Sequence, residues 1–265
     1  MPVMDWYAPG TFCWADLGTS DATAAKQFYT ALFGWTAEDR PMGPGAFYTM
    51  LTLDGRAVAA LYPQDPAPAG GPPHWLSYIS VASANDAARR AKELGGTVLV
   101  DAFDVLDVGR MALVQDGPGA VVALWQPRGH AGAGVIGETS AICWNELATT
   151  DLSRAEAFYT GMFGWSAGTQ TVGNARYTTF TQDGAARGGM LAIDPSWGPV
   201  PPHWLVYFAV SDCDGQTALV QSLGGAVRVP PTDIPEVGRF AIVADPQGAT
   251  FAVLQPLPAW RAAAG

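Results

Sequence analysis

The stretch Cys13-Trp14-Ala15-Asp16-Leu17 returns 130 residues later (143 minus 13) as Cys143-Trp144-Asn145-Glu146-Leu147. Further motifs return at the same offset or at one residue less. They are Phe28-Tyr29 with Phe158-Tyr159, Phe33-Gly34-Trp35 with Phe163-Gly164-Trp165, Pro72-Pro73-His74-Trp75 with Pro201-Pro202-His203-Trp204, and Val108-Gly109-Arg110 with Val237-Gly238-Arg239. A constant period of this length indicates a duplicated domain. A functional site is therefore expected at equivalent positions in both halves.

The duplication divides the 265-residue chain into two domains. We predict a first domain over 1–127, a linker rich in Gly and Ala over 128–137, a second domain over 138–256 and a C-terminal tail over 257–265. Because the two repeats supply a pseudo-dimer within one chain, we expect a monomer.

Composition limits the classes of protein to which the chain can belong. With 49% hydrophobic and 14% charged residues, it can bury two ordinary cores. A formal net charge of −10 argues against a nucleic-acid partner. No apolar run approaches the roughly 20 residues of a membrane span, and no signal peptide is recognisable, so we expect a cytoplasmic protein without a membrane partner. Three cysteines without a CxxC pair indicate packed thiols.

Hydrophobic periodicity in the first repeat predicts two strand–helix units. In the first unit, Ser20 or Asp21 can cap the helix, and Gly34 stands where a helix usually ends. A Pro/Gly-rich connector over 63–73 leads to the second unit. We predict helices over 21–33 and 84–94, and strands over 12–17, 46–53, 56–62, 75–81, 97–103, 110–115 and 120–126.

This run of units resembles the vicinal oxygen chelate superfamily. The resemblance rests on the Phe-Tyr pair of the first helix, its Phe-Gly-Trp exit and an Asp-Pro-x-Gly turn at Asp245-Pro246-Gln247-Gly248. That superfamily contains glyoxalase I, extradiol dioxygenases, fosfomycin-resistance enzymes and bleomycin-binding proteins. The resemblance implies an α+β fold of two tandem glyoxalase-like domains, each built of paired βαβββ modules around a cavity. It is less specific for function.

The resemblance also places the superfamily's metal ligands on this sequence, where no residue at those positions is a metal donor. Divalent metals require imidazole, carboxylate or thiolate groups. The implied positions are Trp14, Ala60, Leu76 and Ala123 in the first repeat and Trp144, Gly189, Leu205 and Ala252 in the second. We therefore expect neither a metal nor another cofactor. The open alternative is that His74 and His203, two residues before an implied ligand, bind metal; otherwise each is a rim histidine bonded to backbone.

Two tryptophans and two carboxylates are the main candidate site residues. Trp14 and Trp144 would either stack on a planar ligand or fill a vacated cavity as core. Strand alternation places Asp16 and Glu146 on the same faces, where each could serve in acid–base catalysis, ligand hydrogen bonding or structure. Arg110 and Arg239 are expected to pair with acidic neighbours or rim carbonyls. The predicted ligand-binding residues are Trp14, Tyr48, Leu76, Tyr78, Ala123, Trp144, Tyr177, Leu205, Tyr207 and Ala252.

We interpret the chain as a metal-independent binder of a hydrophobic or aromatic small molecule. The ligand would be an antibiotic or a natural-product intermediate, and the role would be sequestration, self-resistance or biosynthesis. An enzyme is the alternative: an isomerase, cyclase or hydroxylase component with Asp16 or Glu146 as the acid or base. A metal-dependent lyase or dioxygenase is a second alternative, which requires His74 and His203 as ligands.

Overall fold

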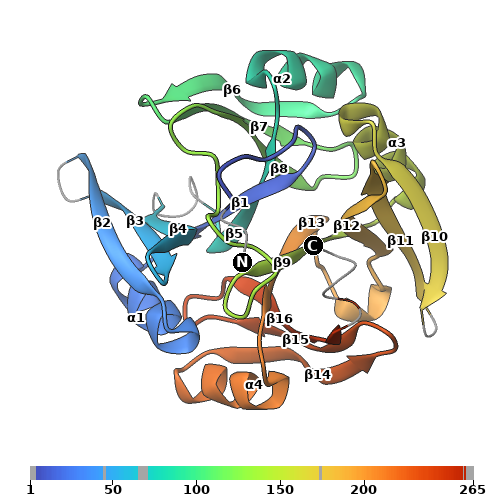
Figure 1. The fold of residues 1–265 in the computed structure, drawn as a ribbon. Coiled ribbons are helices and arrows are strands. Elements are labelled where there is room, and N and C mark those ends of the chain that lie inside the picture. The colour runs from blue at the N-terminus through green and yellow to red at the C-terminus, as the bar shows by residue number, and fades with distance from the viewer. Residues whose placement is uncertain (1–3, 44–45, 65–70, 173–174, 259, 261–265) are drawn as a thin grey trace.

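Each repeat forms its own eight-stranded sheet in the computed structural model, which describes residues 4–43, 46–64, 71–172, 175–258 and 260. The strand order is β2-β3-β4-β1-β5-β8-β7-β6 in the first sheet and β10-β11-β12-β9-β13-β16-β15-β14 in the second (Figure 1). The two βαβββ modules of a repeat join where β1 meets β5 and where β9 meets β13. The predicted α+β fold of two tandem paired-module domains is confirmed, and the modules of each sheet pair within a repeat.

The two repeats contain equivalent elements in the same order. The first has β1 (Phe12–Thr19), α1 (Ala22–Phe33), β2 (Thr36–Gly43), β3 (Ala46–Leu53), β4 (Arg56–Pro63), β5 (His74–Ser80), α2 (Ala84–Glu93), β6 (Thr97–Val105), β7 (Gly109–Gln115) and β8 (Val121–Pro127). The second has β9 (Ile142–Thr149), α3 (Leu152–Phe163), β10 (Ser166–Val172), β11 (Ala175–Gln182), β12 (Ala185–Ala192), η1 (Pro195–Trp197), β13 (His203–Ala209), α4 (Cys213–Ser222), β14 (Ala226–Ile234), β15 (Gly238–Ala244) and β16 (Thr250–Pro256).

The predicted boundaries of the first helix are confirmed by its caps. The Asp21 carboxylate accepts a hydrogen bond from the backbone N–H of Ala24 at 2.9 Å, which satisfies one of the free donors of the first turn. Gly34 ends the helix with φ 70°, a left-handed conformation that glycine adopts without strain. Asp151 and Gly164 repeat both caps in α3.

One strand of each first module lacks a recognisable sequence pattern. The hairpin prediction for 46–62 omitted β2, which lies at the sheet edge and is exposed along its whole length. Its sequence, Thr-Ala-Glu-Asp-Arg-Pro-Met-Gly, has no alternation of apolar and polar residues, because neither face of the strand is buried. Charge and proline are typical of edge strands that resist pairing with other chains. The strand is therefore formed by pairing with β3.

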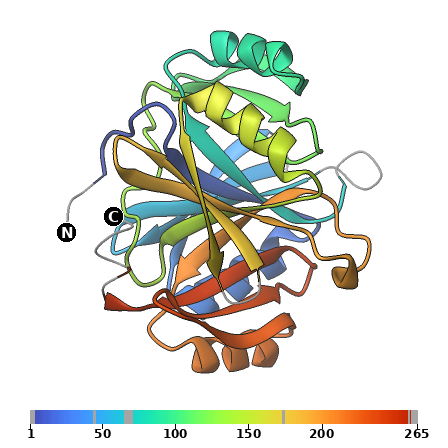
Figure 2. The ribbon, with the colours of Figure 1, turned by 90° about the vertical axis from the view of Figure 1, so that its right-hand side faces the viewer.

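The repeats share their largest cores even though each sheet belongs to one repeat. Helix α2 lies beside α3 at one end of the molecule, and α1 lies beside α4 at the other (Figure 2). One core combines residues of α1 with Phe208 and Phe251 of the second repeat, and the other combines residues of α2 and α3 with Phe12 of the first. Burial of the helix faces therefore requires both repeats.

The most closely repeated motifs build reciprocal contacts between the repeats. The hydroxyl of Tyr29 donates to Asp245 of the other repeat at 3.0 Å and accepts from the indole of Trp75. Tyr159 accepts from Trp204 in the same way and contacts Asp116 of the first repeat. The tryptophans that follow α1 and α3 also bond to the other repeat: the Trp35 indole donates to the Ser140 carbonyl and the Trp165 indole to the Gly10 carbonyl. These motifs therefore join the halves.

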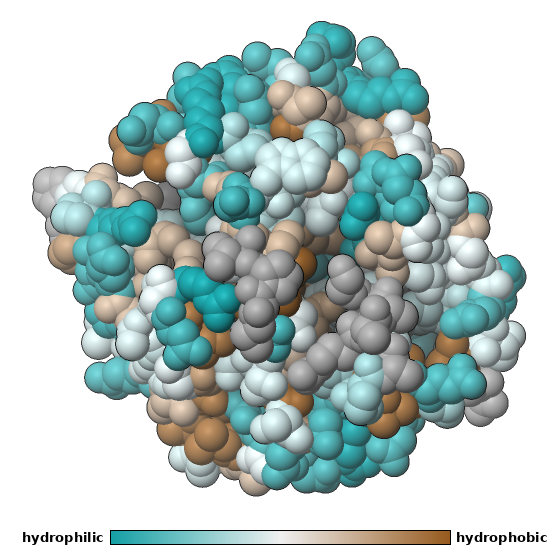
Figure 3. All heavy atoms as spheres, in the orientation of Figure 1, coloured by the Kyte–Doolittle hydropathy of each residue, from teal (hydrophilic) through white to brown (hydrophobic). Residues whose placement is uncertain are grey.

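The visible surface is mostly hydrophilic, with hydrophobic residues in separate groups (Figure 3). Among the described residues, the most exposed large apolar side chains are Leu106, Trp6 and Met42. No helix in the described part of the chain has the length and apolar character to cross a membrane.

Candidate functional site

The inner face of each sheet, defined as the side opposite its helices, carries the predicted site residues. On the first sheet, Asp16 of β1 is the Cα partner of Ala60 on β4 and of Leu76 on β5. Tyr78 in turn pairs with Ala123 on β8. Because strand side chains alternate between faces, these residues and Trp14 lie on one side, and all of them except Asp16 belong to one buried apolar cluster, against which Tyr48 packs. The positions that the resemblance implied do come together.

A carboxylate bonded to two tyrosines lies at the centre of the first inner face. Asp16 Oδ2 accepts hydrogen bonds from the hydroxyls of Tyr78 at 2.8 Å and Tyr48 at 3.1 Å. The Tyr48 oxygen in turn accepts from Trp14 Nε1 at 3.1 Å. Asp16 is 2% exposed, and its second oxygen, Oδ1, is buried without a hydrogen-bond partner among the described residues.

Burial controls the protonation of this carboxyl group. Removal from water disfavours the charged form and raises the pKa of Asp16 to about 7, although the bonds from Tyr78 and Tyr48 oppose the shift. Burial, and after it the neighbouring Asp16 carboxylate, raises the pKa of both tyrosines well above the ordinary value. Asp16 therefore exchanges its proton near neutral pH while the tyrosines remain donors.

Segments outside the sheet close one end of the first inner face. The imidazole of His130 lies edge-on to the Trp14 indole, with ring centroids 4.7 Å apart. The His130 carbonyl accepts from the indole of Trp125, and the Ala133 carbonyl accepts from the hydroxyl of Tyr7. Trp14 is thus buried beneath the predicted linker, in contact with core rather than exposed to a cavity.

A pocket of about 360 Å³ adjoins the same face beyond Asp16. It lies over the end of β4, the start of β5 and parts of β7 and β8. Its lining residues are Tyr62, Pro63, Gln64, His74, Leu76, Leu113 and Val121. Leu76 links the pocket to the carboxylate, because it lines the pocket and pairs with Asp16 across β1 and β5. A volume of this size suits a small organic ligand.

The second inner face repeats the polar cluster with different accessibility. Glu146 accepts from the Tyr207 hydroxyl at 2.7 Å and also interacts with the hydroxyl of Tyr177. The Trp144 indole donates to Tyr177 at 2.9 Å and lies against Trp260. Burial raises the pKa of Glu146. Unlike Asp16 and Trp14, both Glu146 and Trp144 are partly exposed. Leu205 and Ala252 belong to the buried cluster on this face.

The residues at the implied metal positions do not fit a divalent cation. In the first repeat these positions carry indole, methyl and isobutyl groups around Asp16, which is one carboxylate already bonded to two tyrosines. His74 and His203 instead direct Nδ1 to the carbonyls of Pro72 and Pro201, both at 2.9 Å, as expected of rim histidines. Across the described residues, no three His, Cys, Asp or Glu side chains are grouped suitably for a metal.

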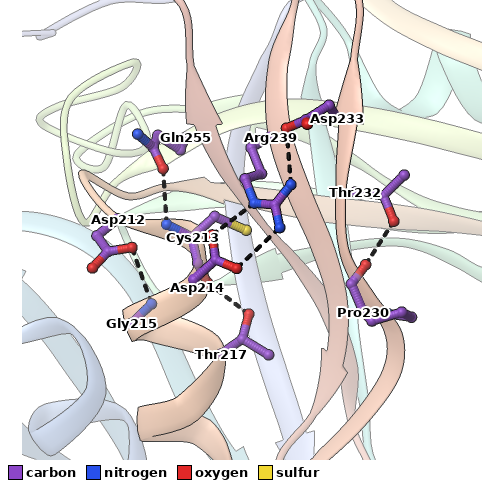
Figure 4. Close-up of polar contacts among 10 residues, drawn as sticks. All are labelled: Asp212, Cys213, Asp214, Gly215, Thr217, Pro230, Thr232, Asp233, Arg239 and Gln255. Atoms are coloured by element: carbon purple, nitrogen blue, oxygen red, sulfur yellow. Dashed lines mark hydrogen bonds and ion pairs between the residues drawn. The ribbon is translucent and has the colours of Figure 1, made fainter.

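The arginines have structural partners, as predicted. Arg110 pairs with Asp104 at 2.9 Å, and Arg239 binds both Asp214 and Asp233 (Figure 4). Arg239 also lines a groove of about 950 Å³ near the C-terminal end of β16. Because its guanidinium is already engaged by two carboxylates, this larger groove is a weaker candidate for ligand recognition than the pocket beside Asp16.

Several residues around the two inner faces were missed from the sequence. Tyr62 and Gln64 extend the Ala60 side of β4, so counting by twos from Ala60 would have found them. His130 and Trp260 lie in segments without strand or helix periodicity, and no sequence pattern placed them against Trp14 and Trp144.

Known proteins share this architecture. CFP32 of Mycobacterium tuberculosis, a protein provisionally named as a glyoxylase, is 44% identical over 97% of this chain and 99% of its own length. The anthracycline biosynthesis protein DnrV of Streptomyces peucetius is 35% identical over 99% of both chains. Among solved structures, the Mn(II)-bound glyoxalase of Novosphingobium aromaticivorans has a TM-score of 0.62 at 15% identity and covers 95% of this chain and 84% of its own.

The 2,3-dioxygenase LapB of Pseudomonas sp. KL28 has a TM-score of 0.65 at 13% identity, with 94% of each chain covered. At such identities the structural likeness concerns the fold alone. The family match is direct, because residues 11–124 and 141–253 each match the same family description. The chain belongs to the Glyoxalase/Bleomycin resistance protein/Dioxygenase superfamily.

Proposed function

We propose that this protein binds an apolar, partly aromatic small molecule on its inner faces without a metal ion, and that it does so in a biosynthetic pathway. One observation carries the proposal: Leu76, at one of the implied metal positions, lines a pocket of about 360 Å³, and the other implied positions of that repeat hold Trp14, Ala60 and Ala123, none of which is a metal donor. Apolar walls with a few placed polar groups are typical of small-molecule sites.

The surrounding chemistry supports binding of a ring system. Tyr62, Leu76, Leu113 and Val121 provide aromatic and aliphatic surface in the pocket. Contact with an aromatic ligand is worth about 1 kcal/mol beyond area burial. Two relatives named as anthracycline biosynthesis proteins, at 35% and 37% identity, favour a polycyclic natural-product intermediate.

Elemental analysis combined with calorimetric titration tests the proposal. We expect the purified protein to lack stoichiometric divalent metal and to bind naphthalene and anthraquinone probes equally well with and without a chelator. One equivalent of zinc, iron, manganese or nickel per repeat, together with loss of probe binding after chelation, would contradict it.

Acid–base catalysis by Asp16 is a second candidate function, favoured by a specific observation. Its pKa of about 7 and its unpartnered Oδ1 suit a group that exchanges protons with a bound molecule. A positioned general base contributes about 10²–10⁴-fold to a reaction rate. Incubation of a bound compound with wild type and with Asp16→Asn, followed by mass spectrometry, separates the functions: a product formed only by the wild type indicates an enzyme.

A further inference from the structure

We propose that the pocket of the first repeat selects ligands that donate two hydrogen bonds, which Gln64 Oε1 and Asp16 Oδ1 accept. This inference rests on the proposed function and assigns the ligand a chemical class: a hydroxylated aromatic compound rather than a hydrocarbon or an aryl ether. It also assigns this recognition to one repeat.

The first acceptor is the side-chain oxygen of Gln64. Its amide nitrogen donates to the Gly71 carbonyl at 2.6 Å, which fixes the orientation of the amide. Oε1 is buried and has no hydrogen-bond partner among the described residues. It lies over Gly18, because a Cβ added to that glycine would be 2.7 Å from Oε1. Gly18 and Asp16 face the same side of β1, so Oε1 lies on the inner face.

The second acceptor is Asp16 Oδ1 in the ionised form of the carboxyl group, which predominates above the pKa of about 7. The two tyrosine hydroxyls both reach Oδ2, which leaves Oδ1 buried and without a partner in the described structure. Leu76 and Tyr62 of the pocket lie next to Asp16 and Gly18 in the strand register. A buried acceptor without a hydrogen-bond partner is unfavourable, so a ligand donor at either oxygen contributes binding free energy that a hydrocarbon cannot.

The equivalent position in the second repeat cannot make this contact. Counting 129 residues from Gln64 and Tyr62 leads to Ile193 and Leu191, and counting 130 from Gly18 leads to Ala148. Isoleucine and leucine offer no acceptor, and Ala148 carries the methyl group that Gly18 lacks. Ala148 and Leu191 pair in the sheet as Gly18 and Tyr62 do, so the comparison concerns the same place in both folds.

Calorimetry with three probes of one shape class tests the inference: naphthalene, dihydroxynaphthalene and dimethoxynaphthalene. We expect wild type to bind dihydroxynaphthalene at least about tenfold more tightly than dimethoxynaphthalene, because only the former donates hydrogen bonds. Gln64→Met keeps the length of the side chain but removes the amide oxygen, and it should reduce that preference about two- to tenfold. Asp16→Asn should reduce it at least as much. Gln27→Leu, on the exposed surface of α1, is the matched control and should leave it unchanged.

The outcomes separate this inference from the proposed function. If none of the three probes binds, the proposed function fails and takes the inference with it. If naphthalene binds but the dihydroxy and dimethoxy compounds bind equally, the function stands and the inference is overturned. The inference is also overturned if the preference persists in both Gln64→Met and Asp16→Asn. Thermal denaturation of each variant verifies its fold, and Gln64→Leu replaces Gln64→Met if the latter unfolds.

Discussion

The two inner faces have the same fold and motifs but differ in how they are covered. On the first, Cys13, Trp14 and Asp16 are buried, whereas on the second Cys143, Trp144 and Glu146 are partly exposed. The segments after β8 and β16 both place a ring against the central indole, His130 at 4.7 Å and Trp260 at 5.6 Å. Duplication thus preserved the polar cluster while changing its access to solvent.

An exchange of glycine positions accompanies this difference. Gly18 leaves space beneath Tyr62 and Gln64 in the first repeat, where the second has Ala148. The second repeat instead has Gly189 where the first has Ala60, and the Tyr177 hydroxyl lies so close to Gly189 that a methyl group there would overlap it. The tyrosine therefore packs down onto the second sheet. In the first repeat, the ring of Tyr48 instead stacks against that of Tyr62, with ring centroids 6.3 Å apart. The comparison indicates that small residues decide where each inner face leaves space.

The largest expected difference concerns the two carboxylates and pH. Because the pKa of Asp16 is raised from 3.8 to about 7, the folded state binds this proton more tightly than the unfolded chain. The associated stability is complete below about pH 4 and is lost as pH rises through about 7. Asparagine does not titrate, so the Asp16→Asn variant does not lose this stability. The effect of the substitution on the free energy of unfolding should therefore be more favourable at pH 8 than at pH 4, by up to about 4 kcal/mol.

Glu146→Gln is the comparison for that measurement. The pKa of Glu146 is also raised, but this side chain is partly exposed. We therefore expect Glu146→Gln to increase the free energy of unfolding at pH 8, relative to pH 4, by less than Asp16→Asn does. Urea denaturation of both variants at the two pH values measures the effects. Equal pH dependence in Asp16→Asn and wild type would contradict the assignment of the raised pKa to Asp16.

Thiol labelling should reveal the difference in coverage directly. Cys143 is partly exposed, whereas Cys13 and Cys213 are buried and burial raises the pKa of both thiols. We expect iodoacetamide to label Cys143 at least about 100-fold faster, equivalent to about 2.7 kcal/mol, because the other two react only after local opening. Peptide mass spectrometry over time identifies the order. Labelling of Cys13 first would mean that the linker does not close the first inner face.

Substitution of the two central indoles should give a smaller difference. Trp14→Phe removes a bond to Tyr48 and leaves space beneath His130, and we expect a loss of about 2 kcal/mol. Trp144→Phe removes the equivalent bond at a partly exposed site and should cost about 1 kcal/mol. Chemical denaturation compares them. A larger loss for Trp144→Phe would show that the second face is the more tightly packed.

Exchange of the small residues should have the smallest effect on stability. Gly18→Ala adds a methyl against the ends of two side chains, so strain and improved strand preference should nearly cancel, within about 0.5 kcal/mol. Ala148→Gly should cost about 0.5–1 kcal/mol. Calorimetry should nevertheless show weaker dihydroxynaphthalene binding for Gly18→Ala only. Unchanged binding would remove Gly18 from the site.

Much of the fold and of the polar cluster was predictable because both depend on local patterns. The helix caps at Asp21 and Gly34 follow from side-chain chemistry. Alternation along β1 correctly placed Trp14 and Asp16 on one face, which Tyr78 of the adjacent strand β5 shares. The raised pKa of Asp16 followed from the expected apolar surroundings. Strand β2 escaped prediction because an exposed edge strand carries no burial pattern.

The sequence by itself determined the duplication and the tandem α+β fold. It also determined the alternation along the strands that groups a carboxylate with an indole and tyrosines in each half. These depend on residue spacing, which repeats along the chain. Only the tertiary structure showed that the best-preserved motifs, such as Tyr29 with Asp245, join the repeats, and that His130 closes one inner face. It also placed Gln64, whose side-chain oxygen is unpaired, in the wall of a pocket, and Asp16 next to Leu76 of the same wall. Contacts between distant segments depend on how the sheets pack, and no periodicity along the chain encodes that arrangement.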